Sequence, residues 1–132
     1  MNHGALTIEE DRPLTASERT LVRWLLENGG ESAQTFLPQI GQLRVIGRCA
    51  CGCASVDFAV GGQAVRDADE SMKVLSDYNW VDDEERFFGV YIFARRGVLA
   101  GLDLWSIDGA AIPNALPEIE RLRPVEPRGV DV

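Results

Sequence analysis

The sequence is poor in residue types that support several familiar kinds of chemistry. It has one lysine, Lys73, among 13 basic residues against 21 acidic ones, and the net charge of −8 disfavours binding to nucleic acid or anionic membranes. Its one histidine, His3, lies in a polar N-terminal segment, so a Ser-His-Asp or Cys-His site is not expected. The longest apolar run, residues 87–94, is far too short to span a bilayer.

Features of exported proteins are also missing. The first residues include Glu9, Glu10 and Asp11 and have no apolar core, so they do not resemble a secretory signal. The three cysteines are an odd number, whereas an extracellular disulfide framework normally has an even one. We therefore expect a cytoplasmic protein with reduced thiols.

The length of 132 residues predicts one domain. Helical patterns come first and strand patterns follow, which favours an α+β fold. We expect an N-terminal helix pair packed on an antiparallel sheet of four to five strands built from hairpins. The domain should span residues 13–124, between a flexible segment at 1–12 and a frayed C-terminus at 125–132.

The first helix has a clear start signal. Thr15 is followed three residues later by Glu18, which is the pattern of a capping box. Asn28 and the two glycines after it predict its end. A short second helix is expected at residues 32–37, and strands are expected at 43–50, 53–60, 73–81, 86–95 and 98–107.

The last hairpin is expected to be apolar on both faces. Pairing Arg95 with Val98 places Phe88, Val90, Ile92, Leu99 and Trp105 on one face and Phe87, Tyr91, Phe93, Leu102 and Leu104 on the other. The first helix can cover one of these faces. The C-terminal segment or a second subunit must then cover the other, so a homodimer is one of two alternatives.

The most unusual motif is a run of alternate cysteines, Cys49, Cys51 and Cys53. A two-residue hairpin loop at Cys51-Gly52 gives one wholly apolar face, and a one-residue slip would destroy that face. In this register Cys49 points to the core, Cys51 lies at the tip and Cys53 points outward. The three sulfur atoms are then expected to diverge.

Three interpretations of the cysteine run stay open. The first is a structural turn with incidental thiols. The second is a zinc or copper site formed by Cys51, Cys53 and Cys49, although zinc sites usually have two residues between paired cysteines, and monovalent copper accepts fewer thiolates. The third is a redox pair formed by Cys51 and Cys53.

Asp103 interrupts an apolar strand between Leu102 and Leu104. A carboxylate buried there must be hydrogen-bonded or protonated, which would suit proton transfer or ligand anchoring. The alternative is an ordinary half-exposed strand position.

Three stretches resemble a group of small uncharacterised bacterial proteins with the signature R-C-x-C-G-C-x-S-V-D-F. They are residues 12–15 with Glu18, residues 48–58, and residues 101–105. The resemblance implies a bacterial, cytoplasmic protein and carries no known activity, cofactor or site.

The acidic surface, the apolar sheet faces and the lack of a recognisable catalytic set favour a non-catalytic binding or protein-interaction domain. An immunity-type or regulatory protein with a basic partner and no cofactor is one form of it. The alternative is a thiolate metal-binding or thiol-redox protein using the cysteine run. A third hypothesis is a small-molecule enzyme around Asp103 and the three tryptophans.

Overall fold

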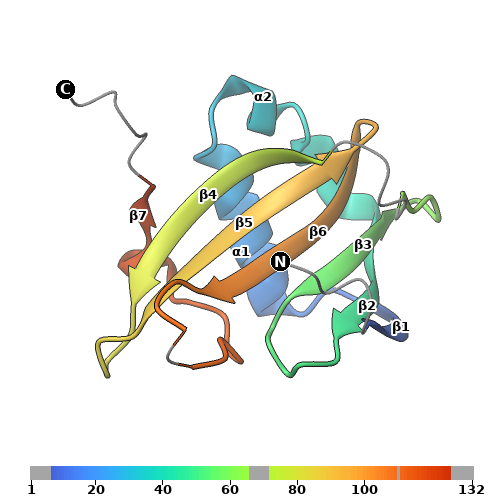
Figure 1. Ribbon diagram of the computed structural model, residues 1–132. Helices are drawn as coiled ribbons and strands as arrows, with labels where there is room; N and C mark the ends of the chain where they lie inside the picture. The colour runs from blue at the N-terminus through green and yellow to red at the C-terminus, as the bar shows by residue number, and fades with distance from the viewer. Residues whose placement is uncertain (1–6, 66–71, 110, 126–132) are drawn as a thin grey trace.

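The computed structural model describes residues 7–65, 72–109 and 111–125 and has the predicted α+β class (Figure 1). These residues form one antiparallel sheet of seven strands, in the order β1-β2-β3-β6-β5-β4-β7. The strands are β1 (Thr7–Pro13), β2 (Leu43–Cys49), β3 (Val56–Val60), β4 (Lys73–Val81), β5 (Phe87–Arg95), β6 (Val98–Ser106) and β7 (Arg123–Pro124). The prediction of four to five strands was therefore wrong, because it omitted the two outer ones.

Strand β1 occupies the second half of the segment that the sequence predicted to be flexible. It is charged rather than apolar, and ion pairs link it to the exposed face of β2: Glu10 with Arg48 and Asp11 with Arg44, each at 2.7 Å. A strand held by charges at a sheet edge has no hydrophobic pattern to reveal it. His3 and the C-terminal residues 126–132 lie outside the described residues.

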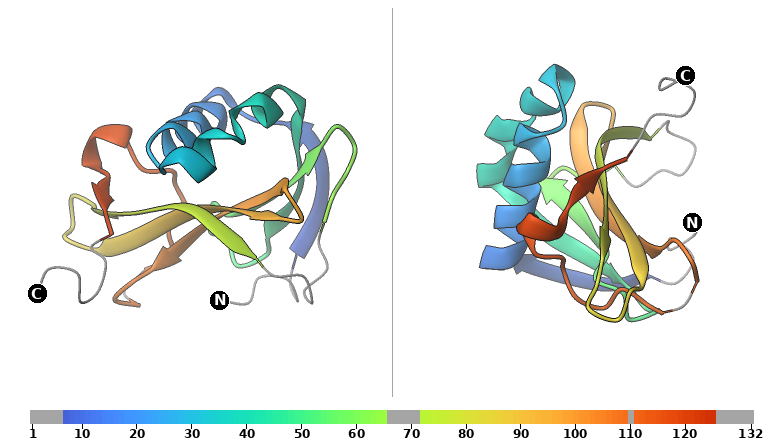
Figure 2. Two further views of the ribbon diagram at one scale, coloured as in Figure 1. Left: turned by 90° about the horizontal axis from the view of Figure 1, so that it is seen from above. Right: turned by 90° about the vertical axis from the view of Figure 1, so that its left-hand side faces the viewer.

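The helices form a layer on one face of the sheet (Figure 2). They are α1 (Ala16–Glu27), the single-turn α2 (Glu31–Gln34) and the 3-10 helix η2 (Leu37–Gln42), while the 3-10 helix η3 (Ile119–Arg121) precedes β7. The predicted helix pair is thus one full helix followed by two short pieces, with Pro38 in the first turn of η2. No helix in the described ranges is long and apolar enough to cross a membrane.

Both predicted ends of α1 are confirmed. The Thr15 side chain accepts from the Glu18 N–H, the Glu18 carboxylate accepts from the Thr15 N–H, and Asn28 is the C-cap. Gly29 has a second role, because a Cβ there would lie 2.6 Å from the carbonyl oxygen of Leu75 in β4. The helix end therefore packs directly on the sheet.

The hydrophobic core lies between α1 and the sheet. It is made of fully buried aliphatic and aromatic side chains from both layers, including Leu21, Val22, Leu25, Leu26, Ile40, Val45, Phe58, Val90, Ile92, Leu99, Leu102 and Leu104. Because α1 buries one continuous stripe, its stability comes from this packing more than from helix propensity.

A bulge in β6 changes the predicted faces of the last hairpin. Arg95 pairs with Val98 as expected, but the register then shifts at Ala100. Leu102 and Leu104 consequently face the helices, whereas Asp103 and Trp105 face the other side. The helix-free face is less apolar than predicted, and the homodimer stays a prediction.

Candidate functional site

The loop between β2 and β3 carries the three cysteines. Leu43, Arg44 and Val45 pair with β3 as the sequence predicted, but a bulge at Ile46 then shifts the register by one residue. The strands therefore stop at Cys49 and resume at Val56, and the connection is a six-residue loop (50–55) instead of a two-residue turn.

The longer loop brings the sulfur atoms together. The predictions that Cys49 is buried and that Cys51 is exposed are confirmed, but Cys53 is also buried, at 8% exposure. All three Sγ atoms lie within 4.8 Å of one another. The prediction that they diverge was wrong, because it assumed an unbulged hairpin.

Backbone amides support the sulfur cluster. The N–H of Cys51 donates to Cys49 Sγ at 3.3 Å, and the N–H of Cys53 donates to Cys51 Sγ at 3.4 Å. Gly52, with φ of 95°, lets the chain turn between these contacts. Hydrogen bonds donated to sulfur favour its thiolate form, so these two amides oppose the effect of burial, which favours the neutral thiol.

The three thiols differ in acidity. Burial, reinforced by the hydrogen bond with Cys51, raises the pKa of Cys49 to about 12. Burial also raises the pKa of Cys53. Partial loss of hydration would also raise the pKa of the exposed Cys51. Hydrogen bonds from the Cys49 thiol and the Cys53 amide outweigh this effect and lower the Cys51 pKa. Cys51 is therefore the exposed thiol that ionises first.

Asp103 is buried, at 5% exposure, so the half-exposed interpretation was wrong. Its Oδ1 accepts a hydrogen bond from the Ser55 hydroxyl at 2.8 Å, and its Oδ2 accepts one from the Tyr91 hydroxyl at 2.6 Å. Burial and the adjacent Asp103 raise the pKa of Tyr91 above its ordinary range, so this donor keeps its proton.

Ser55 links Asp103 to the cysteines. The Cys53 thiol donates to Ser55 Oγ at 3.3 Å, and the Leu104 N–H donates to the same oxygen at 2.8 Å. The sequence singled out Cys53 and Asp103 separately and missed Ser55 and Tyr91. Tyr91 lies opposite Asp103 only because of the β6 bulge, so the register inferred from the sequence could not reveal it.

The cysteines form a three-donor set. Among residues 7–65, 72–109 and 111–125, no histidine or carboxylate joins them as a fourth donor. Sulfurs around one zinc ion, each about 2.3 Å from the metal, would lie about 3.8 Å apart. Here the Cys49 and Cys51 sulfurs are 2.7 Å apart and no two of the three are more than 4.8 Å apart, so one ion can contact all three once the sulfurs shift by about 1 Å.

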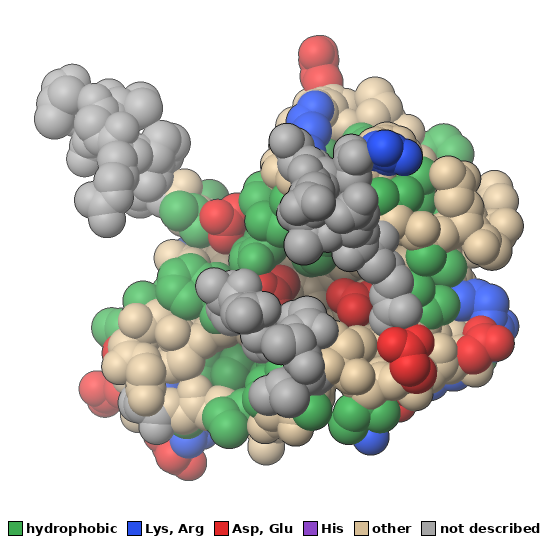
Figure 3. Space-filling view, turned by 45° about the vertical axis from the view of Figure 1, so that its right-hand side comes forward, with side chains coloured by type: hydrophobic (Ala, Val, Ile, Leu, Met, Phe, Trp, Pro, Cys, Tyr) green, Lys and Arg blue, Asp and Glu red, His purple; other side chains and the backbone are tan. Residues whose placement is uncertain are grey.

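The helix-free face has a mixed surface. On the face seen in Figure 3, acidic and hydrophobic side chains lie side by side, with basic ones toward the margins. The Trp105 ring lies over Gly89 and the Phe93 ring over Gly101, at positions where a Cβ would collide with them. Each of these two rings thus packs against a glycine of the neighbouring strand.

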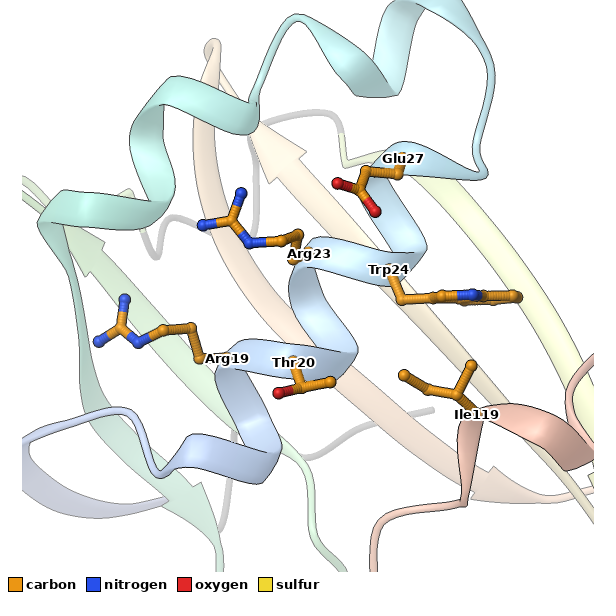
Figure 4. A pocket seen from close by; sticks show the side chains of 6 residues that line it. All are labelled: Arg19, Thr20, Arg23, Trp24, Glu27 and Ile119. Atoms are coloured by element: carbon orange, nitrogen blue, oxygen red, sulfur yellow. The ribbon is translucent and has the colours of Figure 1, made fainter.

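Three surface depressions lie elsewhere, and Asp103 lines none of them. One of about 250 Å³ runs along the outer side of α1, where Arg19 and Arg23 point the same way and Trp24 approaches Ile119 (Figure 4). A second, of about 540 Å³, is lined by Trp80 and several other residues near β7, and a third, of about 310 Å³, lies beside it. The tryptophans therefore do not converge with Asp103 on one of these depressions.

The comparisons with known proteins return no match: no family model, no curated protein and no solved structure is similar to this chain. The resemblance to a group of small bacterial proteins with the cysteine signature thus stays a prediction.

Proposed function

We propose that the protein is a non-catalytic binding domain whose ligand is monovalent copper, held by the thiolates of Cys49, Cys51 and Cys53. The observation that carries this proposal is the convergence of three sulfur atoms within 4.8 Å on one short loop. Two backbone N–H···S hydrogen bonds add to it, because they stabilise the thiolates that a metal requires.

The donor set favours copper over zinc. Structural zinc is almost always bound by four ligands, whereas soft monovalent copper is selected by thiolates and is satisfied by fewer of them. The described part of the chain offers three thiols and no fourth donor beside them. Exposed Cys51 gives an ion a point of entry, and the net charge of −8 attracts cations.

Anaerobic titration with monovalent copper, buffered by a competing chelator, tests the proposal. The wild type should bind one ion per chain, and the Cys51→Ala and triple Cys→Ala variants should lose the high-affinity site. Equal binding by the wild type and the triple variant would refute a thiolate site. Stoichiometric zinc with no copper preference would refute the choice of metal.

A second candidate, thiol redox chemistry, is favoured by one distance. Cys49 and Cys51 Sγ lie 2.7 Å apart, and this short distance favours them as the redox pair over the predicted Cys51 and Cys53. Their two thiols would lose two protons and two electrons to a small-molecule disulfide, which becomes two thiols as the Cys49–Cys51 bond forms. Oxidised glutathione should then give an internal disulfide by peptide mass spectrometry, and a stable mixed disulfide on Cys51 alone would count against it.

The expected basic protein partner stays a prediction. It is compatible with metal binding, because a cargo-binding domain can also dock on another protein. A pull-down at low salt that recovers no partner would weigh against it.

A further inference from the structure

A buried chain of hydrogen bonds leads away from the cysteine loop. It runs from the Cys53 thiol to the Ser55 hydroxyl, from that hydroxyl to Asp103, and ends at the Tyr91 hydroxyl, which also donates to Asp103. Ser55 lies in the loop, whereas Asp103 and Tyr91 lie on the central strands β6 and β5. These hydrogen bonds thus connect a loop to the central strands of the sheet, which are the more rigid elements.

Asp103 is an expensive residue to bury in a strand of apolar neighbours. A buried carboxylate persists only where hydrogen bonds compensate for its lost hydration. Here Ser55 and Tyr91 supply such bonds at 2.8 and 2.6 Å. An apolar residue would pack in this strand without the cost of losing hydration. Strand packing alone therefore does not explain an aspartate at position 103.

The hydrogen bonds that reach Cys53 restrict its side-chain conformation. A cysteine side chain has three staggered rotamers, and only some of them can direct the sulfur toward Cys49 and Cys51. The Ser55 hydroxyl contacts Cys53 Sγ and is itself fixed by Asp103 and by the Leu104 N–H. A fixed hydroxyl therefore favours the converging rotamer.

We propose that Ser55, Asp103 and Tyr91 form a positioning network that holds Cys53 as the third sulfur ligand of the copper site. The inference rests on the proposed function. Ser55 donates its one hydroxyl proton to Asp103 while its oxygen accepts from the Cys53 thiol, so the network positions Cys53 in the metal-free protein, before the thiol loses its proton to the ion. Asp103 and Tyr91 act through Ser55 and do not touch the metal.

The test is a double-mutant cycle on copper affinity, measured anaerobically against a competing chelator. Ser55→Ala should weaken binding about tenfold, the lower end of the range for lost outer-shell partners of metal ligands. In a Cys53→Ala background the same change should have no effect, because the ligand through which it acts is gone. Tyr91→Phe should show the same pattern with a smaller loss.

Matched controls separate positioning from general stability. Ser76 is a buried serine in β4 whose hydroxyl has no hydrogen-bond partner among the described residues, so Ser76→Ala should leave affinity unchanged. Tyr78→Phe removes a tyrosine hydroxyl that donates to the Asn28 carbonyl, away from the loop. X-ray absorption should also show the sulfur coordination of copper falling from three to two in Ser55→Ala.

The outcomes are distinguishable. If the wild type binds no copper, both the proposed function and this inference fail. If it binds copper and Ser55→Ala binds equally tightly with three sulfurs, the inference alone fails. A Ser55→Ala loss that persists in the Cys53→Ala background would also overturn the inference, because it would show a purely structural effect.

Discussion

Glu18 ties the first helix to the first strand. Its carboxylate accepts two hydrogen bonds from Arg12, both at 2.9 Å, and one from the Thr15 N–H at 2.9 Å, while its side chain is nearly buried. Burial alone would raise its pKa, but these hydrogen bonds outweigh burial and lower it. The acid is therefore charged when folded, and its contacts depend on that charge.

Glu18→Gln should reduce the free energy of unfolding by about 1–2 kcal/mol at neutral pH, the scale of a lost cap and a charged hydrogen bond. A lowered folded pKa gives stability that is present above the unfolded value and lost as the pH falls through the folded one. The difference from wild type should thus shrink below about pH 4.5. Urea denaturation at several pH values measures it.

Glu27→Gln, at an exposed position of the same helix, is the control and should change the stability little at any pH. A difference for Glu18→Gln that stays constant from neutral to acidic pH would contradict the role of its charge.

Cys51 should be the first thiol to react with an alkylating agent. It is exposed and its pKa is lowered, whereas burial raises the pKa values of Cys49 and Cys53. Timed iodoacetamide labelling followed by peptide mass spectrometry should show Cys51 modified before the other two. Equal labelling rates for the three cysteines in the folded protein would contradict this order.

Single residues were predictable where their partners are near in sequence. The Thr15–Glu18 capping box could be inferred because three residues separate its members. The Ser55–Asp103 contact spans 48 residues and depends on two bulges, so no local pattern announces it. The candidate site was therefore located from the sequence, but its geometry was not.

At the scale of elements, two β-bulges set the strand register in places where the sequence pattern did not predict it. Alternation of apolar residues gave the register of β2 and β3 near Val45 and of β5 and β6 near Arg95. Each register then shifts by one residue, at Ile46 and at Ala100. A bulge inserts one residue without altering local composition, so faces beyond it were assigned wrongly.

In β6, the Phe93 ring packs closely on Gly101. A Cβ at Gly101 would lie 2.6 Å from the Phe93 ring and 3.0 Å from the Val56 carbonyl oxygen. Gly101→Ala should therefore destabilise the fold by about 1–3 kcal/mol, as overpacking does. Chemical denaturation with a constant m-value measures the loss.

Gly41 provides the matched control, because a Cβ there meets nothing within 4 Å. Gly41→Ala should be neutral or should stabilise the protein by about 0.4–1 kcal/mol through the unfolded chain. If both alanine variants behaved alike, the close packing of Phe93 on β6 would be refuted.

At the scale of the whole molecule, the α+β class and the position of the core followed from the order of patterns along the chain. The width of the sheet did not, because β1 is charged and β7 has only two residues. Both outer strands depend on contacts with distant segments, which a single sequence does not display.

Copper should stabilise the entire fold if the proposed site exists. A ligand that binds only the folded state adds about 2.7 kcal/mol to the free energy of unfolding at a free concentration one hundred times its dissociation constant. Anaerobic thermal unfolding should show this shift for the wild type and none for the triple Cys→Ala variant. A shift of equal size in both proteins would point to copper bound elsewhere.

The sheet order has a mechanical consequence. Because β1 and β7 form opposite edges of the sheet, a force that pulls them apart acts across the strands and opens their hydrogen bonds one after another. Strand β7, which pairs with Tyr78 and Asn79 in the part of the chain that the structure describes, should detach at low force. The junction between β3 and β6 is also short, with Val56 and Asp57 as its paired positions in β3, so the same force would part the sheet there and separate the cysteine loop from Asp103.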